Sequence, residues 1–169
     1  TIYSESAAIA EMLSLDLTDL DTTLPLEVVS CGVPFLFVPI KTLAAMQAIQ
    51  FRHDVWERVL RDFETPHLFA FTPEVETTGS TVHSRMFAPA MGIAEDPATG
   101  AVSGPLGCYL VRHGRATSDR SMEIISEQGF EMGRPSFIQI TIEHKGEHIT
   151  GVQVGGQCHF MGEGFIELP

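Results

Sequence analysis

Positive charge is scarce in this chain of 169 residues. Lys and Arg together number 10 against 22 Asp and Glu, which gives a formal net charge of −12. A surface that binds nucleic acid needs basic side chains to neutralise phosphates, so this balance excludes nucleic acid as an expected partner. The chain also lacks an apolar run of membrane-spanning length, and its start lacks the basic-then-apolar pattern of a signal peptide. We therefore expect a cytoplasmic protein that does not enter a membrane.

Cysteine is also rare. Cys31, Cys108 and Cys158 are odd in number and widely spaced, which provides neither a C-x-x-C pair nor a disulfide framework. Among the histidines, His144 and His148 are four residues apart, but they flank a predicted hairpin turn and do not share a helix face. The sequence therefore predicts reduced thiols and no metal site.

The composition is that of an ordinary globular protein, with 44% hydrophobic and 19% charged residues. Apolar residues recur at helical spacing over Ser6–Leu15, and the acidic stretch Asp16–Thr23 reads as a linker after that helix. This stretch contains the one candidate boundary. We expect residues 1–23 and residues 24–169 to form two parts of the chain.

The larger part is rich in strands. Leu26–Ser30 and Phe35–Ile40 are β-rich runs joined by a short turn, so they are expected to be adjacent antiparallel strands. Amphipathic spacing predicts helices over Lys41–Gln50 and Asp54–Phe63. Further strands are expected over His67–Thr72, Thr81–Phe87, Met122–Ser126, Ser136–Glu143, His148–Val154, Gln157–Met161 and Phe165–Leu168.

One predicted helix, Thr99–His113, has no polar face. A helix that is apolar all round must be enclosed, here by the strands on either side of it in the sequence. Gly104 and Gly107 would let neighbouring backbone approach this helix closely. The pattern therefore favours a central helix covered by a sheet.

The start of this helix is the best candidate for chemistry. The first turn of a helix has N–H groups without intrahelical partners, and small residues such as Gly100 and Ala101 would let an anion approach them. Asp96 lies just before that turn and could act as an acid or base beside a bound carboxylate. The alternative is structural, because Asp96 or Thr99 could simply be the N-cap of the helix.

Several motifs in order support the first interpretation. The run Glu95-Asp96-Pro97-Ala98-Thr99-Gly100 is preceded by Arg85-Met86-Phe87-Ala88-Pro89 and followed by Gln128-Gly129 and Met132-Gly133-Arg134-Pro135-Ser136. This set resembles the PhzF family of phenazine-biosynthesis-type isomerases, which share the diaminopimelate epimerase fold. The resemblance implies an α+β fold, in which a mixed or antiparallel β-barrel wraps around a central apolar helix.

The resemblance implies a protein of two such lobes in tandem, with the active site in the cleft between them. The resemblance implies that residues 1–23 are a crossover helix and linker from a missing first lobe and that residues 24–169 are the second lobe. It also implies a homodimeric enzyme that needs no cofactor. The glutamate assigned as acid or base in the family belongs to the first lobe, so we expect this chain alone to be inactive.

The implied reaction is proton transfer on a small substrate that carries a carboxylate. By this resemblance Asp96 is the catalytic residue of this lobe, and Thr99, Gly100 and Ala101 bind the substrate. Glu95 and Arg85 would support the site without touching the substrate.

Two points stay open at the level of sequence. The family usually has serine where this chain has Ala101, and this loss favours an alternative in which the protein binds a ligand or partner without catalysis. Arg134 could contact a ligand carboxylate, but pairing with Glu127 or Glu131 is the preferred expectation.

Overall fold

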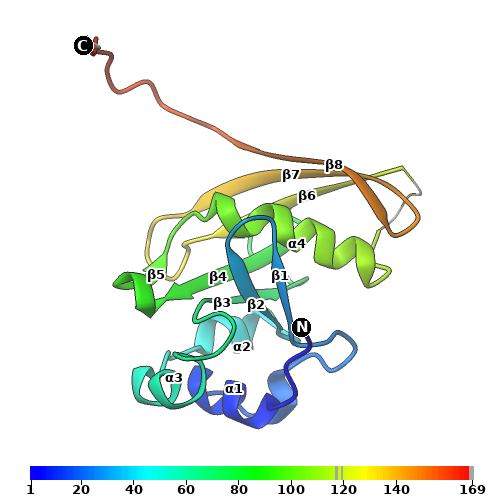
Figure 1. Ribbon diagram of the computed structural model, residues 1–169, viewed down its shortest axis with the longest axis vertical. Helices are drawn as coiled ribbons and strands as arrows, with labels where there is room; N and C mark the ends of the chain where they lie inside the picture. The colour runs from blue at the N-terminus through cyan, green and yellow to red at the C-terminus, as the bar shows by residue number, and fades with distance from the viewer. Residues whose placement is uncertain (117, 119, 168–169) are drawn as a thin grey trace.

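The computed structural model describes residues 1–116, 118 and 120–167 (Figure 1). Its helices are α1 (Ser6–Leu13), α2 (Leu43–Ala48), α3 (His53–Val59) and α4 (Gly100–Arg112), with short 3-10 turns η1 (Leu17–Asp19) and η2 (Pro89–Met91). Its strands are β1 (Glu27–Ser30), β2 (Pro34–Pro39), β3 (Leu68–Thr72), β4 (Val82–Ala88), β5 (Ile93–Asp96), β6 (Ser121–Gln128), β7 (Ser136–Lys145) and β8 (His148–Gly156).

The strands form one mixed sheet in the order β1-β2-β3-β4-β6-β7-β8, and β5 pairs with β4 beside this path. The pairs β2–β3 and β4–β6 are parallel, whereas the other neighbours are antiparallel. The sheet curls around α4, which lies between β1 and β2 on one side and β6 to β8 on the other (Figure 1). The fold is therefore α+β, a half-barrel around a central helix.

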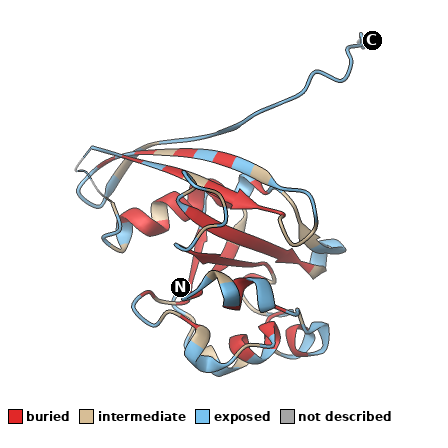
Figure 2. Cartoon of the chain, turned by 180° about the vertical axis from the view of Figure 1, so that it is seen from behind, coloured by how far each residue is buried: buried red, intermediate tan, exposed pale blue. Residues whose placement is uncertain are grey.

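Alternating side chains give the sheet two buried faces. In β2, Leu36 and Val38 pack in the core shared with α1, α2 and α3, while Phe35 and Phe37 pack in the core around α4. This is the period of two that a strand imposes. Figure 2 shows the central strands buried along their length. Strands covered on both faces explain why these runs are apolar almost throughout.

Helix α4 is enclosed, as its sequence predicts. Tyr109 is fully buried in its middle, stacks on Phe37 with ring centroids 5.3 Å apart, and donates a hydrogen bond to the carbonyl of Pro25 at 2.7 Å. A Cβ on Gly107 would lie 2.5 Å from Ile142 Cδ1, so β7 approaches the helix where a side chain is missing. This contact fixes the helix inside the sheet and thereby fixes the place of its N-terminus.

The first residues of the chain belong to the same body as the sheet. Met12 and Leu13 of α1 are fully buried in the core that contains Leu36. The stretch expected as a linker contains η1, and Leu20 forms an isolated bridge with Ile40. Leu20 is buried against the sheet at this bridge, whereas Leu17 is 51% exposed. The division of the chain at residue 23 stays a prediction.

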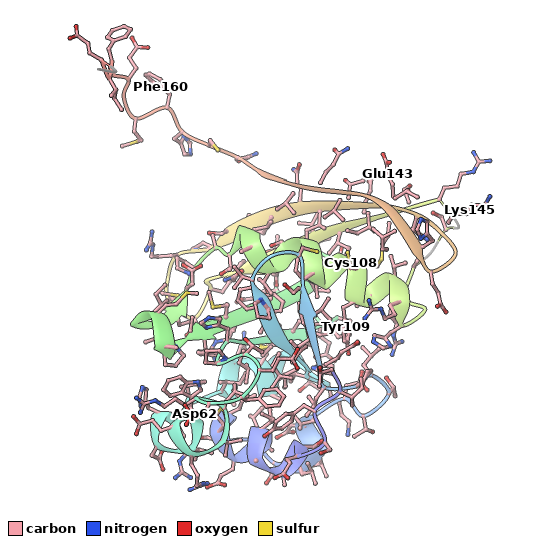
Figure 3. The ribbon with its side chains drawn as sticks, in the orientation of Figure 1. Asp62, Cys108, Tyr109, Glu143, Lys145 and Phe160 are labelled. Carbon is pink, nitrogen blue, oxygen red and sulfur yellow. The ribbon has the colours of Figure 1, made fainter. Side chains whose placement is uncertain are left out.

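The end of the chain differs from the expectation. Residues 157–167 have no regular structure and extend away from the sheet, so the strand expected over Gln157–Met161 is wrong. Phe160, labelled in Figure 3, is 81% exposed on this segment. An alternating pattern forms a strand only beside an edge that accepts its hydrogen bonds, and none of the described residues pairs with this segment. Of the strand expected over Phe165–Leu168, residues 165–167 are irregular and Leu168 lies outside the described residues.

The described residues contain neither a candidate membrane-spanning helix nor a cluster of candidate metal ligands. None of the helices there combines the length and apolarity needed to cross a membrane. No group of three or more His, Cys, Asp and Glu side chains in that part of the chain is arranged to hold a metal ion.

Candidate functional site

A strand, a short turn and a helix bring the predicted motif together. Strand β4 ends at Ala88, the chain turns through η2, and β5 returns along β4 so that Asp96 pairs with Met86. Asp96 is half-buried at the end of β5, and α4 begins four residues later at Gly100. Glu95 and Asp96 stand on strand β5, whose backbone pairs with β4.

Thr99 connects Asp96 to the helix. Its hydroxyl Oγ1 donates a hydrogen bond to Asp96 Oδ2 at 2.5 Å, and Thr99 itself is buried. Thr99 occupies the N-cap position of α4, but its side chain accepts no hydrogen bond from a helix N–H. The hydroxyl of Thr99 contacts Asp96 and Gln128 instead, so the side-chain cap considered for Thr99 from the sequence is not formed.

Gln128 lies at the end of β6, the strand that pairs with β4, and its side chain forms hydrogen bonds with both Asp96 and Thr99. Its Oε1 accepts from the Thr99 N–H at 3.3 Å, and its Nε2 donates to the Asp96 carbonyl at 2.6 Å and to Thr99 Oγ1 at 3.0 Å. Since Thr99 Oγ1 accepts from Gln128, its own hydrogen is directed at Asp96. In the sequence, Gln128 stands out only as part of the Gln128-Gly129 motif, and nothing in that pattern predicts its contacts with Asp96 and Thr99.

The first amides of α4 are open. Gly100 and Ala101 are exposed, and a Cβ built on Gly100 meets no atom within 4 Å. Among the described residues, no acceptor takes the N–H of Gly100 or Ala101. These two donors at the positive end of the helix dipole can therefore receive an anion beside Asp96.

The second carboxylate of the motif is neutralised by a buried arginine. Arg85 Nε and Nη2 each lie 2.8 Å from a different oxygen of Glu95, which is a bidentate ion pair. The Nη1 atom of Arg85 donates to the carbonyls of Met46 and Ile49 at 3.0 and 3.2 Å. Arg85 is only 6% exposed. Glu95 is therefore fixed as a structural anion, and Asp96 is the carboxylate left beside the open amides.

Behind Arg85, His83 lies between two glutamates. Its Nδ1 is 2.8 Å from Glu127 Oε1 and its Nε2 is 2.9 Å from Glu131 Oε1. The parallel pairing of β4 and β6 sets His83 opposite Glu127. The expected pairing of Arg134 with Glu127 or Glu131 is wrong, because His83 takes both carboxylates and Arg134 is exposed.

Protonation of His83 should be visible in a titration. Burial lowers the pKa of His83, but the hydrogen bonds and charges of Glu131 and Glu127 outweigh it, so the pKa lies above the ordinary 6.5. Burial raises the pKa of both glutamates, but hydrogen bonds that include those from His83 bring the net pKa below the ordinary 4.5. The two carboxylates thus favour the protonated form of the imidazole between them.

A raised histidine pKa stabilises the fold fully below pH 6.5, and that stability is lost as the pH rises through the folded-state pKa. The lowered glutamate pKa values give stability above pH 4.5 that is lost as the pH falls through the folded-state values. We therefore expect this cluster to contribute most between these limits. Titration of the His83 ring by NMR should give a midpoint above 6.5, and a midpoint below that value would contradict the assignment.

Gly129 lets the β6–β7 turn reach the motif. It has φ +81°, and a Cβ there would clash with the carbonyl oxygen of Arg134 and lie 2.8 Å from the carbonyl oxygen of Pro97 and 3.0 Å from its Cα. We expect Gly129→Ala to lower the free energy of unfolding by about 2–4 kcal/mol, from the left-handed backbone and overpacking against rigid atoms. Gly133→Ala is the matched control, with φ +64° but nothing within 4 Å. Urea unfolding of both variants separates the two costs, and equal losses would show that the close contacts with Arg134 and Pro97 are unimportant.

Comparisons with known proteins give a consistent result. The family model described as phenazine biosynthesis-like protein matches residues 2–164. A trans-2,3-dihydro-3-hydroxyanthranilate isomerase from Pseudomonas chlororaphis is 36% identical over 148 residues, which are 88% of this chain and 50% of that protein. The corresponding isomerase from Pseudomonas aeruginosa is 36% identical over 143 residues, or 85% of this chain and 48% of the relative.

Solved structures give the same architecture. A PhzF-family phenazine biosynthesis protein from Bacillus anthracis superposes with a TM-score of 0.78 at 26% identity, covering 89% of this chain and 51% of that one. A predicted epimerase from Pseudomonas aeruginosa superposes with a TM-score of 0.65 at 24% identity, covering 96% and 55%. The chain spans about half the length of the curated relatives it matches.

Proposed function

Because this chain belongs to the phenazine biosynthesis-like protein family, we propose that it forms one half of the active site of an isomerase that needs no cofactor. The relatives named above are isomerases. The observation that carries the proposal is the placement of Asp96, which is held by Thr99 next to the open amides of Gly100 and Ala101. The proposed anion site, formed by the amides of Gly100 and Ala101, therefore lies beside the proposed acid or base, Asp96.

In the proposed reaction the substrate carboxylate accepts hydrogen bonds from the N–H groups of Gly100 and Ala101. Asp96 then exchanges a proton with a carbon of the bound molecule. One C–H bond breaks, its electron pair shifts the adjacent double bond, and a proton returns to another carbon, so the substrate gains and loses no atoms. The hydroxyl of Thr99 stabilises the ionised carboxylate of Asp96 by donating to it at 2.5 Å.

The other half of the site has to come from outside residues 1–169. The curated relatives are about twice as long as the matched region. We therefore propose that a further lobe, in the same longer chain or in a separate subunit, covers the open end of α4 and supplies the second acid or base. A homodimer of the two-lobe protein is the proposed assembly.

The substrate we propose is trans-2,3-dihydro-3-hydroxyanthranilate or a cyclic carboxylate of the same class, by analogy with the relatives. Incubating the full-length protein with this compound in D2O tests the proposal. We expect isomerised product that carries one deuterium on carbon, detected by NMR and mass spectrometry. Recovery of the unchanged compound without deuterium would contradict this substrate assignment.

The alternative is a binding protein without catalysis, and Ala101 is the observation that favours it. The family usually has serine at this position, and Ala101 keeps the backbone N–H but supplies no hydroxyl. Ser103 is no substitute, because its hydroxyl is buried and donates to the Thr99 carbonyl at 2.8 Å. Saturable binding of cyclic carboxylates without any deuterium exchange would favour this alternative.

Restoring the hydroxyl gives a direct prediction. We expect Ala101→Ser in the full-length protein to raise kcat/KM for trans-2,3-dihydro-3-hydroxyanthranilate several-fold, up to about tenfold, which is the size of one neutral hydrogen bond. Ser103→Ala is the control and should leave kcat/KM nearly unchanged. An Ala101→Ser variant with unaltered kinetics would show that the substrate does not reach this turn of α4.

A further inference from the structure

A pocket lies at the end of the half-barrel opposite the motif. Helix α4 and strand β6 both run from the motif to this pocket. Gly100 and Gln128 lie at the motif, and Leu110 and Met122 line the pocket. The pocket has a volume of about 240 Å³. Its apolar wall consists of Leu24, Pro39, Ile40, Phe71, Pro73, Val82, Leu110 and Met122.

Two opposite charges flank this apolar wall. Asp21 and Arg115 both line the pocket. Thr23 forms hydrogen bonds with both side chains. Its N–H donates to Asp21 Oδ1 at 2.9 Å, and its hydroxyl accepts from Arg115 Nη2 at 2.8 Å. The carboxylate of Asp21 and the guanidinium of Arg115 therefore lie on either side of Thr23.

The volume limits what can enter. Sites for cofactors and drug-sized ligands are larger, with about 300–1,000 Å³. A nucleotide or a long acyl chain is therefore too big, whereas a small branched molecule fits.

We propose that this pocket binds an apolar α-amino acid of the size of leucine as its zwitterion. The carboxylate pairs with Arg115, the ammonium group pairs with Asp21, and the aliphatic side chain lies against Leu110 and Met122. The proposal is independent of the isomerase function, since none of these residues belongs to the motif around Asp96.

The arrangement of charges selects against close analogues. A simple carboxylate such as 4-methylpentanoate would satisfy Arg115 but would bring its charge close to Asp21 without an ammonium group between them. A simple amine such as 3-methylbutylamine would satisfy Asp21 and repel Arg115. Hydrogen bonds between charged groups are the strong ones, and a like charge at the rim is a repulsive element that gives specificity.

Titration of the full-length protein with L-leucine, followed by calorimetry and by methyl NMR of Met122, tests the proposal. We expect saturable binding with Kd of about 1 mM or tighter. The two analogues should bind about ten- to a hundredfold more weakly, which is the effect of losing one charged hydrogen bond. Arg115→Gln and Asp21→Asn are rim variants with little risk to the core, and each should weaken leucine binding by a similar factor.

Arg61→Gln, in an exposed ion pair with Glu57 beyond the end of α3, is the control and should leave the affinity unchanged. The proposal is overturned if leucine shows no saturable binding up to about 10 mM. It is equally overturned if leucine and its two analogues bind alike, or if neither rim variant weakens the binding of leucine.

Discussion

Asp96→Asn in the full-length protein is expected to lower kcat by a factor of about 100 to 10,000, the contribution that a positioned acid or base makes. Asparagine keeps the shape of the side chain and an oxygen that can accept from Thr99 Oγ1, which is 2.5 Å from Asp96 Oδ2. It cannot, however, take and return a proton at neutral pH. The measurement is the rate of isomerisation of trans-2,3-dihydro-3-hydroxyanthranilate together with the thermal midpoint Tm.

The same variant distinguishes chemistry from structure. Because Asp96 provides no side-chain cap to α4, Tm should stay within a few degrees of the wild-type value. Glu95→Gln is the comparison within the motif, since it weakens the ion pair with Arg85 but leaves Asp96 intact. A large loss of Tm with retained turnover for Asp96→Asn would assign Asp96 to folding and not to catalysis.

Arg85→Met is expected to have the largest effect on stability, a loss of about 3–5 kcal/mol in the free energy of unfolding, because it leaves the largely buried carboxylate of Glu95 without its cation. The side chain of Glu95 is 15% exposed and that of Glu131 is 14% exposed, and Glu131 Oε2 lies 3.9 Å from Arg85 Nε. The carbonyls of Met46 and Ile49 would lose their donor as well. Urea unfolding at pH 7 measures the loss.

Arg58→Met is the matched control. Arg58 pairs with Glu11 at 3.1 Å, but the two side chains are 60% and 44% exposed, so the expected loss is at most about 1 kcal/mol. Similar losses for the two variants would contradict the view that burial makes the Arg85–Glu95 pair important.

Much of the fold could be predicted because its signals are local. The Thr99–His113 run has no polar face, and the structure buries α4 inside the curled sheet accordingly. The paired runs Leu26–Ser30 and Phe35–Ile40 form the antiparallel strands β1 and β2. In these cases periodicity and turn spacing contain the information that decides the structure.

Other parts depend on partners that are distant in the sequence. The Ile-Ala-Glu-Asp run of β5 has little strand propensity and is a strand because β4 lies beside it. Gln128 contacts Asp96 and Thr99 across about thirty residues, and no spacing rule connects these positions. Sequence proximity suggested Arg134 as partner of Glu127, whereas the register of two parallel strands supplies His83.

The central claim is that the open amides at the start of α4 receive the carboxylate of the substrate. The most direct test follows the ¹⁵N–¹H signals of Gly100 and Ala101 in the full-length protein while anthranilate is added. Both signals should move saturably and together, whereas that of Gly151 should stay in place, because its partner Glu143 pairs with Ser121 at the end of β6 opposite Gln128. Saturable anthranilate binding that leaves the Gly100 and Ala101 signals unmoved would contradict the account.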